Sequence, residues 1–211
     1  MTEAVALLDE AGDSALTFRA LAARLGGGVA SIYWYVSSKD ELLDRAADFV
    51  MDQVLDATDD IESDDPIDDL RSTAIALFES VADRPWLGAY FMRNTDTQPN
   101  SLRYYERVGQ HVLRLGLDPL ATFHAASAVI GYVIGIAADL GQQPPDEIVD
   151  GSTSREEYFA RTVAEWNELD PDEWPFLHAI VDVFENHDDT DQFVAGLDLL
   201  LAGLRLQAEQ P

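Results

Sequence analysis

The segment 16-LTFRALAARLGGGVASIYWYVSSK-39 contains two short helical patterns separated by three glycines. Apolar residues recur at helical spacing over 18–25, and Thr17 precedes them as a cap for the first turn. The glycines at 26–28 are expected to end this helix, and 30–35 is predicted to form a second one. Two short helices joined by a glycine-containing turn are typical of a helix-turn-helix, whose second helix enters a DNA major groove.

Charge sets this segment apart from the rest of the chain. The 211 residues include 40 Asp and Glu against 13 Lys and Arg, a formal net charge of −27, whereas residues 14–39 contain Arg19, Arg24 and Lys39 and no acid. A solvated helix pair is expected to share the acidity of its chain. A basic segment without acids therefore indicates a surface that approaches phosphates, the alternative being a chance fluctuation in composition.

A longer stretch, residues 6–50, carries a family resemblance. It contains LT at 16–17, Ala22, LG at 25–26, IYWYV at 32–36, Lys39 and LL at 42–43, and with these marks it resembles the DNA-binding head of TetR-family repressors. The resemblance implies phosphate contacts from Arg19, Tyr33 and Lys39 and base contacts from the start of the second helix. The DNA-binding residues expected on this basis are Thr17, Arg19, Gly28, Val29, Ala30, Ser31, Tyr33, Trp34, Tyr35 and Lys39.

The remainder of the chain is predicted to be helical, because no strand-like alternation of useful length occurs in it. Ser38 and Glu41 have the spacing of a capping box at the start of the next helix. The expected helices cover 39–58, 67–82, a segment opening at 84–86, 102–115, 120–140, 155–168, 173–186 and 191–207, with loops at 59–65 and 142–154. The expected fold is therefore all-α, with a DNA-binding head at 1–48 and a ligand-binding and dimerisation domain at 49–211.

The acidity belongs mainly to the predicted second domain. Residues 1–48 hold eight acids and four bases, a net charge of −4, which leaves −23 for the rest. Adaptation to high salt and a GC-rich genome that favours arginine are both open explanations. The chain has no cysteine and its acidic start lacks the basic flank of a signal peptide, so a cytoplasmic location is expected.

The most apolar predicted helix contains no acidic residue from 119 to 138, long enough to span a bilayer. Polar residues interrupt it and no basic anchors flank it, which favours a soluble core or a dimer interface. Residues 100–135 and 174–204 resemble the tetracycline-repressor subgroup of the family, in which the helices corresponding to 120–140 and 191–207 form a four-helix bundle with their copies. The expected interface residues are Gly131, Gly135, Leu197 and Leu201.

Catalytic motifs are missing from the sequence. Its four histidines lack His-Glu-x-x-His spacing, no Gly-x-Ser-x-Gly occurs, and the three glycines are not followed by Gly-Lys-Ser/Thr, so an enzyme is not expected. His111 and His124 lie among apolar neighbours and are expected to be core or pocket histidines rather than metal ligands. Neither a metal nor a cofactor is expected.

An effector pocket is expected in the second domain. An ungapped comparison places Met92 where the tetracycline-repressor subgroup has a metal-binding histidine, and a thioether is a poor ligand for a hard cation. A magnesium–tetracycline chelate is therefore not expected. The predicted lining suits a flat or aliphatic organic molecule and consists of Met92, Thr95, Tyr105, Val108, His111, Phe123 and Ser127, with Thr95, Ser127 or His111 setting its orientation.

Together these features predict a homodimeric repressor that binds double-stranded operator DNA and is released by a small organic effector. One alternative stays open at this stage. The family's basic N-terminal arm and first helical turn have no counterpart before Thr2. The chain is therefore alternatively expected to be a ligand-binding or protein-interaction module with weak or lost DNA binding.

Overall fold

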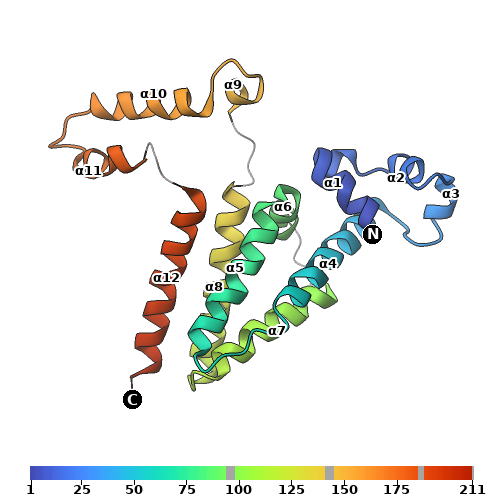
Figure 1. Cartoon of the computed structure of the whole chain (residues 1–211), viewed down its shortest axis with the longest axis horizontal. Coiled ribbons are helices and arrows are strands. Elements are labelled where there is room, and N and C mark those ends of the chain that lie inside the picture. The colour runs from blue at the N-terminus through green and yellow to red at the C-terminus, as the bar shows by residue number, and fades with distance from the viewer. Residues whose placement is uncertain (94–97, 141–144, 185–187, 211) are drawn as a thin grey trace. The chain divides into compact units, whose positions relative to one another are not determined.

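The computed structural model describes residues 1–93, 98–140, 145–184 and 188–210, and within them it contains α-helices and no strand (Figure 1). The helices are α1 (Thr2–Ala15), α2 (Phe18–Arg24), α3 (Val29–Ile32), α4 (Lys39–Ala57), α5 (Pro66–Ala82), α6 (Pro85–Arg93), α7 (Pro99–Leu113), α8 (Pro119–Leu140), α9 (Asp146–Val149), α10 (Arg155–Asn167), α11 (Pro175–Phe184) and α12 (Asp189–Ala208). The all-α prediction is confirmed.

The chain forms two compact units. The main unit comprises residues 1–141 and 196–211, and the second unit comprises 142–195, so that the boundary at 195–196 falls within α12. This division reflects which residues pack together, and it does not mark where the DNA-binding part of the chain ends. The functional boundary at 48–49 expected from the sequence stays a prediction.

Local capping explains where the first helices of the main unit begin and end. The hydroxyl of Thr17 accepts a hydrogen bond from the Ala20 N–H at 3.1 Å, which starts α2, and Gly26 adopts a φ of 65° just beyond its end. The second helix is shorter than the predicted 30–35. After Ile32 the chain tightens into a turn, in which the Tyr35 N–H donates to the Ile32 carbonyl at 2.9 Å.

The cap of α4 departs from the predicted capping box in one bond. The Glu41 N–H donates to Ser38 Oγ at 3.0 Å as expected. The Glu41 carboxylate, however, accepts from the N–H and the hydroxyl of Ser37, at 2.7 and 2.6 Å, rather than from the Ser38 N–H. The Glu41 N–H is therefore capped, and the helix buries an apolar face that includes Leu42, Ala46, Val50 and Val54.

The core of the main unit lies between α5, α6, α7 and α8, which pack against one another. Leu70, Val108 and Val129 are completely buried there. Gly88 lets α6 approach α8 closely, since a Cβ added at this glycine would lie 3.0 Å from the Ala138 Cα. Close-packed helices of this kind give the unit a rigid interior.

The second unit contains α9, α10, α11 and the first turns of α12. The predicted loop 142–154 is corrected by the four-residue helix α9, which is too short for a periodic pattern to reveal. Ser154 and Glu157 form a complete capping box at the start of α10. Phe184 packs against Phe159 and Trp166, with ring centroids 5.5 and 4.5 Å apart, so aromatic side chains join α10 to α11.

Candidate functional site

The turn that follows α3 presents three aromatic side chains to solvent. Tyr33, Trp34 and Tyr35 are 60%, 88% and 74% exposed, whereas the flanking Ile32 and Val36 are buried. Exposed aromatic residues in such number are unusual on a surface without a partner. Their buried neighbours anchor the turn, so the aromatic side chains are held outward as a group.

All ten residues predicted to contact DNA are exposed. They lie at the start of α2, along α3, in the turn after α3 and at the first residue of α4. Tyr33 packs edge-on against Phe18, with ring centroids 4.7 Å apart, which fixes the turn to α2. The structure thus leaves these residues accessible, although Thr17 already uses its hydroxyl as the cap of α2.

Residues 14–39 contain no acid, but in the folded protein acids from outside this segment lie next to it. Carboxylates of α1 pair with two of its three bases. Arg24 pairs with Glu10 and lies 3.7 Å from Glu3, and Lys39 Nζ lies 2.9 Å from Asp13 Oδ1. Within the described residues, Arg19 has no carboxylate partner. It is therefore the base of this segment most available to a phosphate.

These ion pairs keep the α1 carboxylates charged. Hydrogen bonding from Arg24 lowers the pKa of Glu10, and hydrogen bonding from Lys39 lowers the pKa of Asp13, with a smaller contribution from Arg93. Glu10 and Asp13 therefore stay ionised at neutral pH and reduce the positive potential of the segment.

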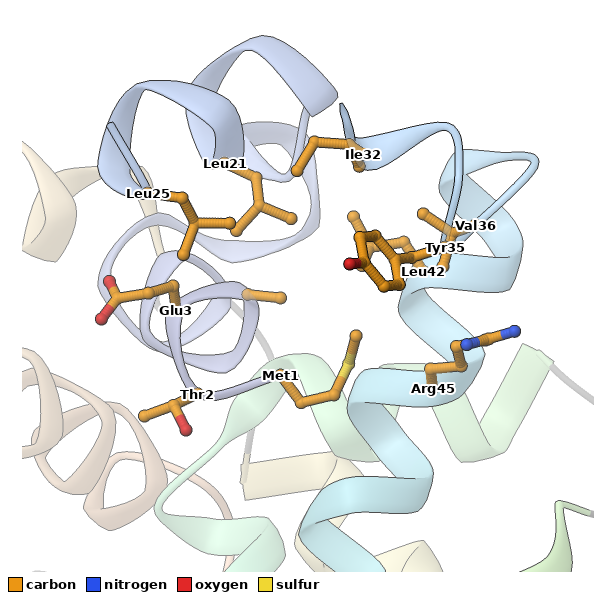
Figure 2. Close-up of a pocket in the computed structure, with 11 residues that line it drawn as sticks. Met1, Thr2, Glu3, Leu21, Leu25, Ile32, Tyr35, Val36, Leu42 and Arg45 are labelled. Atoms are coloured by element: carbon orange, nitrogen blue, oxygen red, sulfur yellow. The ribbon is translucent and has the colours of Figure 1, made fainter. Parts of the chain in front are cut away.

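A cavity of about 420 Å³ lies on the inner side of α3, between α1, α2, α3 and α4 (Figure 2). Leu21, Ile32, Val36 and Leu42 line it, together with Arg45 of α4 (Figure 2). The sequence pattern predicted these apolar residues as helix faces but not the space between them. The inner side of α3 is consequently packed less completely than the core of the main unit.

Hydrogen bonds connect α1 and α4 to α6 and α7. Trp86 Nε1 donates to Asp9 Oδ1 at 2.7 Å, and the Tyr90 hydroxyl donates to Asp44 Oδ1 at 2.9 Å. The Asn100 N–H donates to a carboxylate oxygen of Asp48 at 2.7 Å. Acids that the sequence presented only as surface charge are thus specific acceptors for groups on α6 and α7.

Within the described residues, the members of the predicted effector lining differ widely in exposure. Val108 and His111 are buried on α7 and Ser127 is half-buried, whereas Met92 and Phe123 are 66% and 56% exposed. Tyr105 is also exposed, and Thr95 lies outside the described residues. The two cavities described in the main unit, the one behind α3 and an open one along α7 from Pro99 to Gln110, include none of these residues.

His111 belongs to a buried polar cluster rather than to an open pocket. Its Nε2 lies 3.4 Å from Thr73 Oγ1, and its Nδ1 lies 3.8 Å from Asp69 Oδ2. Burial lowers the pKa of His111, which favours the neutral ring. Asp69 also pairs with Arg114 and accepts from the Ser63 N–H, so the cluster satisfies its own polar groups and does not favour a ligand-orienting role for His111.

The two predicted interface helices expose apolar stripes. On α8 the stripe contains Leu120, Ala128, Gly131 and Gly135 and also the exposed His124, which was expected in the core or a pocket. On α12 it contains Leu199, Ala202, Gly203 and Leu206. Helix α8 is long and apolar enough to cross a membrane by length and composition, and 28% of that apolar window is buried. We call these two surfaces the α8 stripe and the α12 stripe.

Leu197 and Leu201 do not lie on the α12 stripe. Both are buried within the chain, at 0% and 2% exposure. A Cβ added at Gly196 would overlap the Tyr132 hydroxyl, which shows that this face of α12 packs on α8 of the same chain. Apolar spacing indicated two buried faces, but it did not tell which residues face the chain's own core.

Comparison with known proteins identifies the family. The model of the bacterial regulatory proteins of the tetR family matches residues 1–46, and the model of the tetracyclin repressor-like C-terminal domain matches residues 60–208. The chain belongs to the TetR family. The TetR resemblance stated from the sequence is therefore confirmed, and the protein is a transcriptional repressor of TetR type.

Two HTH-type transcriptional regulators match most of the chain. An HTH-type transcriptional regulator from Saccharopolyspora erythraea is 33% identical over 162 residues, covering 76% of this chain and 68% of that protein. The HTH-type transcriptional repressor DrrR1 from Streptomyces coeruleorubidus is 28% identical over 210 residues, covering 98% of this chain and 76% of that protein.

Solved TetR structures have the same fold. The TetR regulator SCO7222 from Streptomyces coelicolor superposes with a TM-score of 0.81 at 35% identity, covering 97% of this chain and 95% of that one. ActR from Streptomyces coelicolor in complex with actinorhodin superposes with a TM-score of 0.79 at 22% identity, covering 99% and 96%. At that identity ActR shows the fold alone.

The TetR match also corrects one expectation. The DNA-binding model covers residues 1–46. The alternative of a module that has lost DNA binding because its N-terminal arm is missing is therefore not supported.

Proposed function

We propose that the protein is a homodimeric, ligand-responsive repressor whose two α3 helices enter successive major grooves of a palindromic operator. The exposed surface formed by Arg19, α3 and the aromatic turn Tyr33, Trp34 and Tyr35 carries this proposal. Two-fold symmetry requires half-sites about 34 Å apart or a multiple of that spacing. The strongly acidic remainder of the chain faces away from the DNA in this arrangement.

Within this surface the residues have different proposed roles. Arg19, Tyr33 and Lys39 contact phosphates, which sets affinity on any sequence. Val29, Ala30 and Ser31 on α3 face the bases with methyl groups and one hydroxyl. Such side chains distinguish bases through thymine methyl contacts and a single hydrogen bond. Because they offer few hydrogen-bond donors to the base edges, we expect low sequence specificity from direct readout.

The dimer of this proposal forms through the α8 and α12 stripes. Each stripe is apolar and exposed in one chain, as an obligate helix–helix interface requires before its partner is added. Gly131 and Gly135 permit close approach of a helix from the second copy. We place this dimer in the cytoplasm, where it meets DNA.

Binding to DNA is tested by selection from a pool of duplexes with a randomised centre. The expected result is enrichment of a palindrome whose half-sites show two symmetric footprints. Sedimentation equilibrium of the complex should give two chains per duplex. Absence of any enriched sequence at low salt would overturn the proposed function.

The proposed effector is an apolar organic molecule bound in the region of residues 60–208. Met92 stands where a metal–tetracycline site is expected to have a histidine, and a thioether is a poor ligand for a hard cation. ActR, which has the same fold, is known in complex with actinorhodin, and this supports an organic ligand for the fold. Calorimetry with tetracycline is expected to show no magnesium-dependent binding, and tight binding that requires magnesium would contradict the proposal.

A further inference from the structure

The carboxylate of Asp13, near the end of α1, contacts both Lys39 of the DNA-binding head and Arg93 of α6. Lys39 Nζ lies 2.9 Å from Asp13 Oδ1 and donates to the Asp13 backbone oxygen at 2.7 Å. The second carboxylate oxygen accepts from Arg93 Nη2 at 3.3 Å. Lys39 is the first residue of α4 and Arg93 the last of α6, so Asp13 is shared between two helices.

This contact lies between partly exposed side chains. Asp13 and Lys39 are 34% and 43% exposed, while the Oδ1 atom of Asp13 is buried. An ion pair at such exposure is worth less than about 1 kcal/mol and exchanges without disturbing the core. A phosphate oxygen that reaches Lys39 can therefore take the place of the carboxylate.

We propose that Asp13 competes with DNA for Lys39 and thereby lowers the affinity of the head for DNA. The inference rests on the proposed DNA contact of Lys39. Both competitors are oxyanions that accept from the same ammonium group, so the ion pair formed in the free protein must be broken or shared on binding. Arg93 opposes the competition because it draws the same carboxylate toward α6.

Arg93 is expected to increase DNA affinity, because it weakens the hold of Asp13 on Lys39. While Arg93 holds Asp13, the carboxylate divides its attraction between two cations. Removing the Arg93 side chain leaves Asp13 wholly to Lys39 and is expected to reduce DNA affinity.

The test compares Asp13→Asn with Asp40→Asn. Asp40 is exposed, is next to Lys39 in sequence, and has no ion pair within the described residues, so the control removes the same charge without the contact. Affinity is measured by fluorescence anisotropy on the duplex that the wild-type protein enriches. Asp13→Asn is expected to bind about two- to five-fold more tightly than Asp40→Asn, the range of a surface ion pair.

Two further variants separate the contact from a general effect of charge. In a Lys39→Gln background the gain from Asp13→Asn should vanish, and Arg93→Gln alone should weaken binding. Equal affinity of Asp13→Asn and Asp40→Asn, or a gain that persists without Lys39, would overturn the inference. Failure of the wild type to enrich any duplex would instead overturn the proposed function. Circular dichroism melting confirms that each variant is folded.

Discussion

Among the three bases of residues 14–39, Arg19 has no carboxylate partner within the described part of the chain. Arg24, on the same helix, is paired with acids of α1. Arg19→Ala is expected to weaken DNA binding on all sequences and to reduce the salt slope by about one, as loss of one phosphate contact does. Arg24→Ala removes the same charge and should have the smaller effect. Titrations at several salt concentrations measure both, and an unchanged slope for Arg19→Ala contradicts the proposed docking face.

His111 gives a prediction about pH. Its pKa is lowered by burial in the folded protein, so the unfolded chain binds more protons as the pH falls. Stability should therefore decrease as the pH falls from 7.5 through the ordinary histidine range toward 5.5. His111→Gln should be less stable at pH 7.5 but show a flatter decrease. Urea melts across this range test it, and parallel pH profiles would count against a neutral buried ring.

At the scale of the helix, Gly88 fixes the distance between α6 and α8. Gly88→Ala places a Cβ 3.0 Å from the Ala138 backbone, which should destabilise the protein by about 1–3 kcal/mol through overpacking. Gly109→Ala is the matched control, since an added Cβ there meets no atom within 4 Å apart from the neighbouring backbone of its own helix. It should stabilise the helix by up to about 1 kcal/mol. Thermal melting distinguishes the two, and equal shifts in one direction would contradict the described packing.

Sequence periodicity predicted most helices to within a few residues because caps and apolar spacing are local properties. The Asp65 carboxylate, for example, accepts from the Ile67 N–H at 2.9 Å, and Pro66 begins α5 as expected. The short helices were predicted less well. The helix predicted at 30–35 ends at Ile32, and residues 33–35 form a turn. Helix α9 was not predicted, because a single turn is too short to show a period.

The site was less predictable than the helices because its features depend on contacts between distant residues. The segment 14–39 is free of acids in sequence, yet Glu10 and Asp13 reach its bases from α1. Similarly, Leu197 fits an apolar pattern whether it faces the chain's own core or a partner. Spacing along one helix reveals a face, and only the packed structure reveals what that face meets.

At the scale of the whole molecule, the α8 and α12 stripes predict the oligomeric state. Gly135→Leu on the α8 stripe and Leu199→Glu on the α12 stripe should each weaken dimerisation, by steric overlap and by burial of an unpaired charge. Leu113→Glu is the control, because Leu113 is equally apolar and 62% exposed but lies on α7. Sedimentation equilibrium at micromolar concentration measures the change. A monomeric wild-type protein, or equal weakening by the control, contradicts the proposed interface.

The separation of the stripes from the recognition surface has a genetic consequence. A chain with a disabled head but intact α8 and α12 stripes would still pair with a normal chain under the proposed dimer, and each mixed pair would carry one working head. Tight binding to a palindromic operator needs two working heads, one for each half-site. Alleles that damage α3 or Arg19 should therefore be dominant over the wild type when both are expressed, whereas alleles that damage the stripes should be recessive.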